Sequence, residues 1–290
     1  MAPTIAITGS AGGIGAAIAK YYAAKGYNLV LADSAAALLK STTETLQTAF
    51  PSIQILSQPT DVSKESELVA LKDAALKKFA TIDMVFLNAG ISGNYKTEEH
   101  GWWGNPDGMR KLFDVNLFGV VNGISAFLPV LKAQAAASPS ASPYRIIITG
   151  SKQGITNPPG NPAYNASKAA IRFLAEQLSY DLIGQNIKAH LLIPGWVFTG
   201  LAGGVPGVYV EKGTKPAGAW VPDQIAERLA EGLANEEFYI LCPDNEVSIA
   251  TDKIRMEWTA GDWITPRDPL SRWRKEYQDE WAEFLAARQK

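Results

Sequence analysis

Short, uninterrupted apolar runs alternate along most of the chain with longer stretches in which apolar residues recur every three or four positions. A continuous Val-, Ile- and Leu-rich run is typical of a strand buried on both faces, and the longer period is typical of an amphipathic helix. The runs predict strands near residues 4–8, 28–32, 53–57, 83–87, 145–149, 187–193 and 238–241. The periodic stretches predict helices near residues 13–25, 35–49, 64–78, 107–133, 163–182 and 222–234.

Strands that alternate with helices predict βαβ units, and therefore a parallel sheet. We expect an α/β, doubly wound Rossmann-type fold, with a seven-stranded parallel sheet and helices on both faces. Residues 1–245 are expected to form this domain. Residues 246–290 continue beyond the last predicted strand without repeating the pattern, and we expect them to be a Trp-rich C-terminal extension packed on the same domain or on a partner subunit.

Composition narrows the class of protein. The 290 residues are 47% hydrophobic, and 27 Lys and Arg oppose 29 Asp and Glu without any basic block. Nucleic acid and anionic membranes attract basic patches, so we expect neither as a partner. The uncharged run 191–210 contains several Pro and Gly residues, which predicts a loop and not a membrane span.

Two further features bear on location and metals. A single cysteine, Cys242, cannot form an internal disulfide. Two histidines and one cysteine are too few for a typical structural zinc site, so no metal is expected. The chain carries no basic residue before Lys20, so the charged leader of a secretory signal is missing. We therefore expect a cytoplasmic protein.

The first predicted strand runs into a glycine-rich turn and then a helix. Gly9, Gly13 and Gly15 would allow a tight turn and a close approach of the backbone to a pyrophosphate, which would face the N–H groups of the helix. The spacing is not G-x-G-x-x-G, and no Walker lysine follows. A purely structural turn is the alternative.

A carboxylate, Asp33, ends the second predicted strand 24 residues after Gly9, near the separation expected for a ribose-binding acid. It would accept hydrogen bonds from a 2′-hydroxyl and repel a 2′-phosphate. Gly12 and Ser34, where a basic residue could hold that phosphate, are uncharged. The pattern favours NAD over NADP, although Asp33 could simply cap the helix that begins near Ala35.

Tyr164 and Lys168 lie four residues apart on a predicted helix and therefore on one face. Ser151 precedes Tyr164 by 13 residues, just past a predicted strand, and Asn116 falls within the fourth predicted helix. With these residues, the sequence resembles the short-chain dehydrogenase/reductase (SDR) family over about its first 245 residues.

Further motifs agree with this resemblance in the order of the chain. The resemblance implies a catalytic set of Asn116, Ser151, Tyr164 and Lys168. It implies cofactor contacts from Gly9, Gly13, Ile14 and Gly15 in the turn, from Asp33, Asp61, Val62, Asn88, Ala89 and Gly90, from Tyr164 and Lys168, and from Pro194, Gly195 and Thr199. Trp196 after the Pro-Gly pair, Gly150 before the serine and the long tail depart from the usual family pattern.

The mechanism that the resemblance implies is consistent with these residue types. The ammonium of Lys168 and a positively charged nicotinamide favour the Tyr164 phenolate, which exchanges a proton with the substrate oxygen. Ser151 hydrogen-bonds that oxygen while hydride moves at the adjacent carbon. Asn116 is implied to hold a water that relays the proton, and the alternative is a buried helical Asn satisfied by backbone.

All eight tryptophans lie outside the predicted strands and sheet-covering helices, so we expect the core not to use them: Trp102, Trp103, Trp196, Trp220, Trp258, Trp263, Trp273 and Trp281. In the extension, aromatic and apolar residues recur every four positions after Asp268-Pro269, a cap followed by a first-turn proline. This predicts one helix with an apolar stripe formed by Trp273, Tyr277, Trp281 and Leu285.

The segment after Gly195 closes over substrate in this family, and here it contains Trp196, Phe198, Leu201, Val205 and Tyr209. We therefore expect an NAD-dependent oxidoreductase that interconverts a secondary alcohol and a ketone, with an apolar or aromatic substrate. A structural cover on the sheet edge is the alternative role of this segment. The alternatives for the whole chain are an NADPH-dependent carbonyl reductase and a non-catalytic NAD-sensing scaffold.

Family members commonly pair through the two long helices, here 107–133 and 163–182, and many pair again through the last strand. The 49 residues after that strand would cover the second surface. We therefore expect a homodimer, with the extension folded over the sheet edge or reaching towards the substrate segment.

Overall fold

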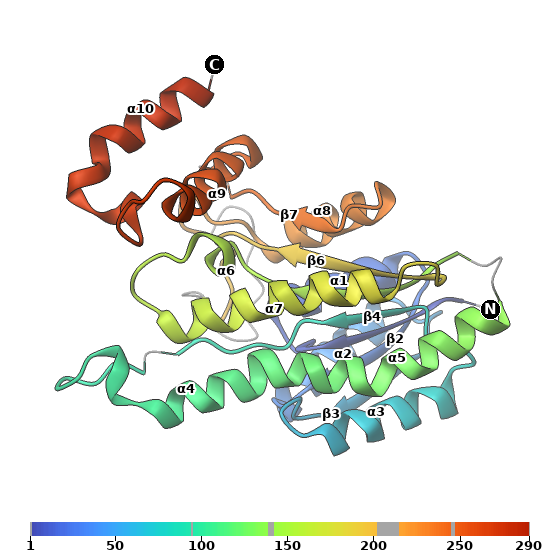
Figure 1. Ribbon diagram of the computed structural model, residues 1–290. Coiled ribbons are helices and arrows are strands. Elements are labelled where there is room, and N and C mark those ends of the chain that lie inside the picture. The colour runs from blue at the N-terminus through green and yellow to red at the C-terminus, as the bar shows by residue number, and fades with distance from the viewer. Residues whose placement is uncertain (1, 94, 139–141, 202–214, 245–246, 290) are drawn as a thin grey trace.

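The computed structural model describes residues 2–93, 95–138, 142–201, 215–244 and 247–289 (Figure 1). Its seven strands form one parallel sheet in the order β3-β2-β1-β4-β5-β6-β7, which confirms the predicted sheet. The strands are β1 (Thr4–Thr8), β2 (Asn28–Asp33), β3 (Ile55–Pro59), β4 (Met84–Leu87), β5 (Tyr144–Thr149), β6 (Ile187–Ile193) and β7 (Tyr239–Leu241).

The third strand starts two residues later than the predicted range of 53–57. Residues 51–53 form a turn instead, in which the Ile53 N–H donates to the Phe50 carbonyl. Pairing with β2 begins only at Ile55, opposite Leu29. The apolar Ile53 is buried without being in a strand, and this burial explains why the sequence pattern extended the strand to it.

Helices cover both faces of the sheet and create two separate apolar cores (Figure 1). One core lies beneath α3 (Glu65–Lys78), α5 (Gly119–Ala137) and α7 (Pro162–Asp181). The other lies beneath α1 (Gly13–Ala24), α2 (Ala36–Ala49) and α8 (Pro222–Ala234). Burial of this apolar surface on both faces is the main favourable contribution to folding.

The strand order reverses beside β1, which lies between β2 and β4. In a doubly wound sheet the chain leaves neighbouring strands towards opposite faces at such a point, and a crevice opens at their carboxyl ends. The glycine-rich turn after β1 and the segments after β4, β5 and β6 all emerge at this edge. The fold therefore brings the predicted motifs to one place.

The predicted helix 107–133 is longer and less regular than expected. It runs through α4 (Pro106–Phe113), a π-helical turn (Asp114–Phe118) and α5, with Pro129 inside. In the described part of the chain, the stretch Pro106–Ala137 is long and apolar enough to span a membrane by length and composition alone. Here it packs on α3 and the sheet, as a core helix of a globular domain does.

The C-terminal extension differs most from the sequence prediction. It begins with a helix that was not predicted, α9 (Ile249–Ile264), followed by short 3-10 turns (Ser271–Trp273 and Lys275–Tyr277) and α10 (Gln278–Arg288). The prediction of one helix from Asp268-Pro269 is therefore wrong, because residues 271–277 bend in two tight turns. Trp273 and Trp281 consequently do not form one helical stripe.

The expectation that no core uses tryptophan is also wrong. Trp258 of α9 is fully buried, and its Nε1 donates to the Ser271 hydroxyl over 2.7 Å. The Arg267 guanidinium lies 3.8 Å from the Trp258 ring centre, and Trp281 and Phe284 contact the same ring edge-on. The extension thus has a small core of its own. Trp220 packs against the main core as well.

Candidate active site

A cavity of about 1140 Å³ opens at the carboxyl edge of the sheet. Most of the predicted site residues line it: Gly9, Gly13, Ile14, Asp33, Asn88, Ala89, Gly90, Ser151, Tyr164, Lys168, Pro194, Gly195 and Thr199. Gly15, Asp61, Val62 and Asn116 do not line it. Among the described residues, no group of three or more His, Cys, Asp or Glu side chains is placed to hold a metal ion.

The turn after β1 requires glycine for two different reasons. Gly9 and Gly13 have φ values of +67° and +53°, which a side chain disfavours. A Cβ on Gly9 would lie 2.8 Å from the Ala89 Cα, and one on Gly15 would lie 2.1 Å from the Gly9 carbonyl oxygen. Gly12 is the N-cap residue of α1 and has no side chain that can accept a hydrogen bond. The first N–H groups of α1 are therefore not capped by a side chain at this position.

Asn88 joins this turn to the centre of the sheet. Its amide nitrogen donates to the carbonyls of Thr8 and Gly9, each over 3.2 Å, and its Oδ1 accepts from the Thr149 hydroxyl. The Thr8 hydroxyl in turn accepts from the backbone N–H groups of Asn88 and Ala89. Asn88 thus fixes the ends of β1, β4 and β5 relative to one another.

Asp33 joins the glycine-rich turn to the start of α2 and also lines the cavity. Its Oδ1 accepts from the Ala35 N–H at the start of α2, and its Oδ2 accepts from the Ala11 N–H in the glycine-rich turn, each over 3.0 Å. The carboxylate therefore stabilises both segments while lining the cavity. These hydrogen bonds hold the negative charge of Asp33 at the cavity wall, beside the glycine-rich turn.

The Asp61-Val62 pair does not line the cavity. Hydrogen bonds from the Ser63 hydroxyl and N–H lower the pKa of Asp61, and Val62 packs against Gly119 at the start of α5. A Cβ on Gly119 would lie 2.6 Å from a Val62 methyl group. These contacts connect the end of β3 to the long helix.

Tyr164 and Lys168 lie one turn apart at the start of α7. Asn161 caps this helix by accepting from the Tyr164 N–H, and Pro162 occupies its first turn. The Lys168 amine donates to the Thr149 carbonyl over 2.9 Å and lies 5.8 Å from the Tyr164 ring centre. The helix thereby holds an ammonium beside the phenol.

Burial acts in opposite senses on these two side chains. It raises the pKa of the Tyr164 phenol, against a smaller lowering by the Ser151 hydroxyl, with which it is hydrogen-bonded. Lys168 is 4% exposed, and burial lowers its pKa to about 8. Without a ligand, the neutral phenol is therefore favoured. A group that stabilises the phenolate must be added before Tyr164 can act as a base near neutral pH.

Asn116 lies in the π-helical turn, is fully buried and does not line the cavity. Its Oδ1 accepts from the Ile91 N–H over 2.7 Å, and its amide donates to the Ile91 carbonyl and to the Ser167 hydroxyl. The Asn116 side chain therefore matches the alternative interpretation of the sequence, a buried helical Asn whose hydrogen bonds are satisfied by backbone groups. A Cβ on Gly90 would lie 3.3 Å from Asn116 Oδ1 and 3.7 Å from the Lys168 amine, so Asn116 remains close to Lys168.

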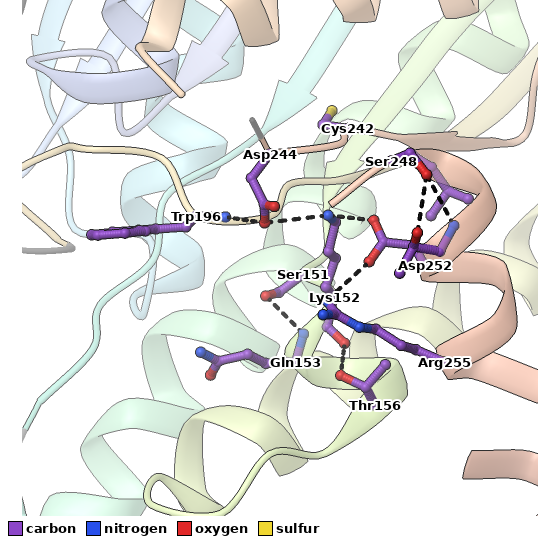
Figure 2. A network of polar contacts seen from close by, with 12 residues as sticks. Ser151, Lys152, Gln153, Thr156, Trp196, Cys242, Asp244, Ser248, Asp252 and Arg255 are labelled. Carbon is purple, nitrogen blue, oxygen red and sulfur yellow. Dashed lines mark hydrogen bonds and ion pairs between the residues drawn. The ribbon is translucent and has the colours of Figure 1, made fainter. Parts of the chain in front are cut away.

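A second polar network, absent from the sequence prediction, adjoins Ser151 (Figure 2). Lys152 lies between the carboxylates of Asp244 and Asp252; the latter belongs to α9 and is 2% exposed. Asp244 also accepts from the Trp196 N–H over 3.4 Å. The network ties together the turn after β5, the segment after β6 and the C-terminal extension.

The extension therefore forms part of the cavity wall, through Asp252, Arg255 and Arg272. A local signal for α9 was present in the sequence: Ser248 caps it by accepting from the Thr251 N–H, and Ile254 and Trp258 follow at helical spacing. No motif indicated that these residues return to the site. That return depends on how α9 packs on α6 (Gln153–Thr156).

Comparison with known proteins places this geometry in a family. Residues 3–206 match the family model described as short chain dehydrogenase. An uncharacterised oxidoreductase of Listeria innocua is 32% identical over 239 residues, which cover 80% of this chain and 91% of the relative.

Two solved structures are also similar. A short-chain dehydrogenase/reductase from Burkholderia phymatum in complex with NAD is 28% identical, with a TM-score of 0.78 and coverage of 92% of this chain and 96% of the other. An alcohol dehydrogenase from Thermococcus sibiricus complexed with 5-hydroxy-NADP is 27% identical, with a TM-score of 0.68 and coverage of 81% and 91%. The chain belongs to the short-chain dehydrogenase/reductase family, oxidoreductases that act on CH–OH groups with a nicotinamide cofactor.

Proposed function

We propose that this protein is an NAD-dependent oxidoreductase that interconverts a secondary alcohol and a ketone. The observation that carries the proposal is the convergence of Ser151, Tyr164 and Lys168 on one cavity, with the ammonium beside the phenol. The same cavity extends to the glycine-rich turn after β1. One continuous space thus offers a cofactor cradle and a proton-exchanging group.

The residues present fit a dinucleotide. Gly9 approaches the Ala89 backbone so closely that a Cβ would clash, and the N-terminus of α1 faces the cavity through Gly12 and Gly13. Its N–H groups and helix dipole suit a pyrophosphate. Asp33 would accept from a ribose hydroxyl, and Pro194, Gly195 and Thr199 would adjoin the nicotinamide. When bound, the cofactor supplies or accepts the hydride at the carbinol carbon.

The protein's own groups then handle the proton. Tyr164 exchanges it with the substrate oxygen, and the Ser151 hydroxyl donates a hydrogen bond to that oxygen as negative charge develops. Lys168 favours the phenolate of Tyr164 through its charge. We assign Asn116 a supporting role, in which it fixes the Ile91 backbone beside Lys168.

The cavity wall after β6 supports an apolar or aromatic body for the substrate, because Trp196, Phe198 and Leu201 line it. Val205 and Tyr209, also expected there from the sequence, lie outside the described residues. The test is an assay of NAD reduction over a panel of aliphatic and aromatic secondary alcohols. Turnover of at least one apolar member supports the proposal, whereas NAD binding without turnover of any member would favour a sensing scaffold.

The direction of the pKa shifts predicts how the rates depend on pH. Alcohol oxidation needs the Tyr164 phenolate, and burial raises the pKa of the phenol, so only a small fraction is ionised near neutral pH. We expect kcat/KM for alcohol oxidation to rise between about pH 6 and pH 8. Ketone reduction uses the phenol and should change little over this range. Steady-state kinetics in both directions check this, and an oxidation rate that falls with pH would contradict it.

We also propose a homodimer built on the two long helices. Phe118, beside α5, is 51% exposed and Phe173 of α7 is 55% exposed, and both elements lie on the same side of the molecule (Figure 1). Exposed apolar side chains on adjacent helices are typical of an interface. The extension packs on α6 and leaves Tyr239 of β7 48% exposed, so it does not cover that part of the last strand as the sequence suggested.

Light scattering tests the dimer. The full chain should show twice the mass of 31.2 kDa, and Phe173→Glu should shift it towards monomer. Trp263→Glu is the control, because Trp263 is also a large apolar side chain and is even more exposed, at 88%, but belongs to α9. A monomeric wild-type chain, or a Phe173→Glu variant that stays dimeric, would refute this interface.

A further inference from the structure

One part of the cavity wall carries charges that the proposed reaction does not use. Lys152 follows Ser151 in the chain, Asp244 follows β7, and Asp252, Arg255 and Arg272 come from the C-terminal extension. The wall therefore has three cations and two carboxylates. Because the cations outnumber the carboxylates by one, one positive charge of this wall has no carboxylate to balance it.

Lys152 forms ion pairs with both of these carboxylates. Its amine contacts Asp252 in a close ion pair and lies 3.4 Å from Asp244 Oδ2. Only 11% of the Lys152 side chain is exposed, so solvent does little to weaken these contacts. The two carboxylates are thereby largely committed to Lys152.

Arg255 and Arg272 are left incompletely compensated. Arg255 is 3.8 Å from Asp252 Oδ1, and its buried Nε has no hydrogen-bond partner. Arg272 stacks on the Trp273 ring at 4.1 Å, and its buried Nη1 has no partner either. Within the described ranges, Arg272 has no carboxylate at ion-pair distance. Burial and the nearby charge of Arg255 lower its pKa to about 10, which still leaves it charged near neutral pH.

A pair of neighbouring guanidinium groups with unmet N–H donors is matched by a carboxylate, which accepts from arginine in a planar, two-bonded geometry. Both arginines line the cavity, and a charged hydrogen bond from either guanidinium to a carboxylate favours binding. Figure 2 shows the Arg255 side chain reaching from α9 towards Ser151 and Lys152, which precede α6. The unmet charge thus lies on the same side of the cavity as the catalytic hydroxyl.

We propose that Arg255 and Arg272 form an anion-binding subsite, and that the substrate is a hydroxy or oxo acid whose carboxylate binds there. This inference rests on the proposed function, because the carbinol carbon must lie at Tyr164. The apolar body would pack against Trp196 and Leu201 between the two ends. The C-terminal extension would then determine specificity by supplying both arginines.

The test compares acids with their neutral esters as ketone substrates. Reduction of 4-acetylbenzoate and of 6-oxoheptanoate is measured beside reduction of their methyl esters, with NADH. We expect kcat/KM to favour the acid of at least one pair by about tenfold or more, as one charged hydrogen bond predicts. Arg272→Gln and Arg255→Gln should each reduce that preference to within about threefold, mainly by raising KM for the acid. Arg272→Lys should retain part of it.

Arg274→Gln is the matched control, because Arg274 is exposed two residues away and does not line the cavity. It should keep the full preference for the acid. Thermal unfolding followed by tryptophan fluorescence identifies variants that fail to fold. If Arg272→Gln fails to fold, Arg255→Gln tests the anion-binding subsite independently. Esters that react as well as the acids in both wild-type pairs would overturn the proposal.

A binding measurement separates this inference from the proposed reaction. Calorimetry with 4-acetylbenzoate on the Tyr164→Phe protein and NADH needs no turnover. We expect Arg272→Gln, added to that variant, to raise the Kd about tenfold or more. If no ketone reacts but this effect is found, the proposed reaction fails and the subsite stands. An unchanged Kd would overturn the subsite even if ketones are reduced.

Discussion

Replacing Tyr164 by Phe is expected to lower kcat by about 100-fold to 10,000-fold, the range that a positioned acid–base group contributes. The substitution keeps the ring and its packing on α7 but removes the hydroxyl to which we assign proton exchange with the substrate oxygen. The ammonium of Lys168, hydrogen-bonded to the Thr149 carbonyl, remains in place. Affinity for NAD should therefore change by less than about threefold, because the cradle after β1 is untouched.

Steady-state kinetics and a fluorescence titration with NAD measure these two effects on one preparation. Tyr180→Phe is the control, because Tyr180 is on the same helix and 71% exposed. It should leave kcat within about twofold. A Tyr164→Phe enzyme with near-normal kcat would show that another group carries the proton.

The choice of cofactor should change with two residues at the end of β2. The Asp33 carboxylate is fixed by the N–H groups of Ala11 and Ala35, so it cannot move away from a 2′-phosphate. Two negative charges in contact are unfavourable by several kcal/mol, and we therefore expect NAD to bind about 100-fold more tightly than NADP or better. Asp33→Ala with Ser34→Arg should narrow or reverse this difference, because a guanidinium binds phosphate well.

Titration of both cofactors into wild-type and variant proteins checks the prediction. Asp33→Asn separates the effect of the charge from that of the hydrogen bonds, because it removes the charge and keeps an oxygen that can accept from the backbone. It should weaken discrimination without creating strong NADP binding. Equal affinity of the wild-type protein for NAD and NADP would contradict the role given to Asp33 and favour the NADPH-dependent alternative.

Much of the fold could be predicted because the sequence patterns that indicate it lie within single strands and helices. Each buried parallel strand is a short apolar run, and each covering helix shows its own period, so seven strands and their order of appearance followed from the pattern. The glycines of the first turn were recognisable because their conformations and close contacts exclude side chains. The motifs fall at strand ends, and a parallel sheet brings those ends together.

The C-terminal extension was harder to predict because its structure depends on contacts distant in sequence. Trp258 is buried by Trp281 and Phe284 of another helix, and by Arg267, whose guanidinium also pairs with Asp262. The four-residue spacing from Trp273 matched a helix, but tertiary contacts of Ser271 with Trp258 and Asp262 favour tight turns there. Likewise, nothing near Lys152 in the sequence indicates that Asp252 would pair with it from 100 residues away.

Transfer of deuterium from substrate to cofactor tests the central claim most directly. Secondary alcohols deuterated at the carbinol carbon, including the hydroxy acids related to the tested ketones, are incubated with the protein and NAD, and the nicotinamide is analysed by mass spectrometry. The account predicts that NADH formed by the wild-type enzyme carries one deuterium, and that Tyr164→Phe forms it at least about 100-fold more slowly. NADH without deuterium, or no NADH from any alcohol while NAD binds, would contradict it.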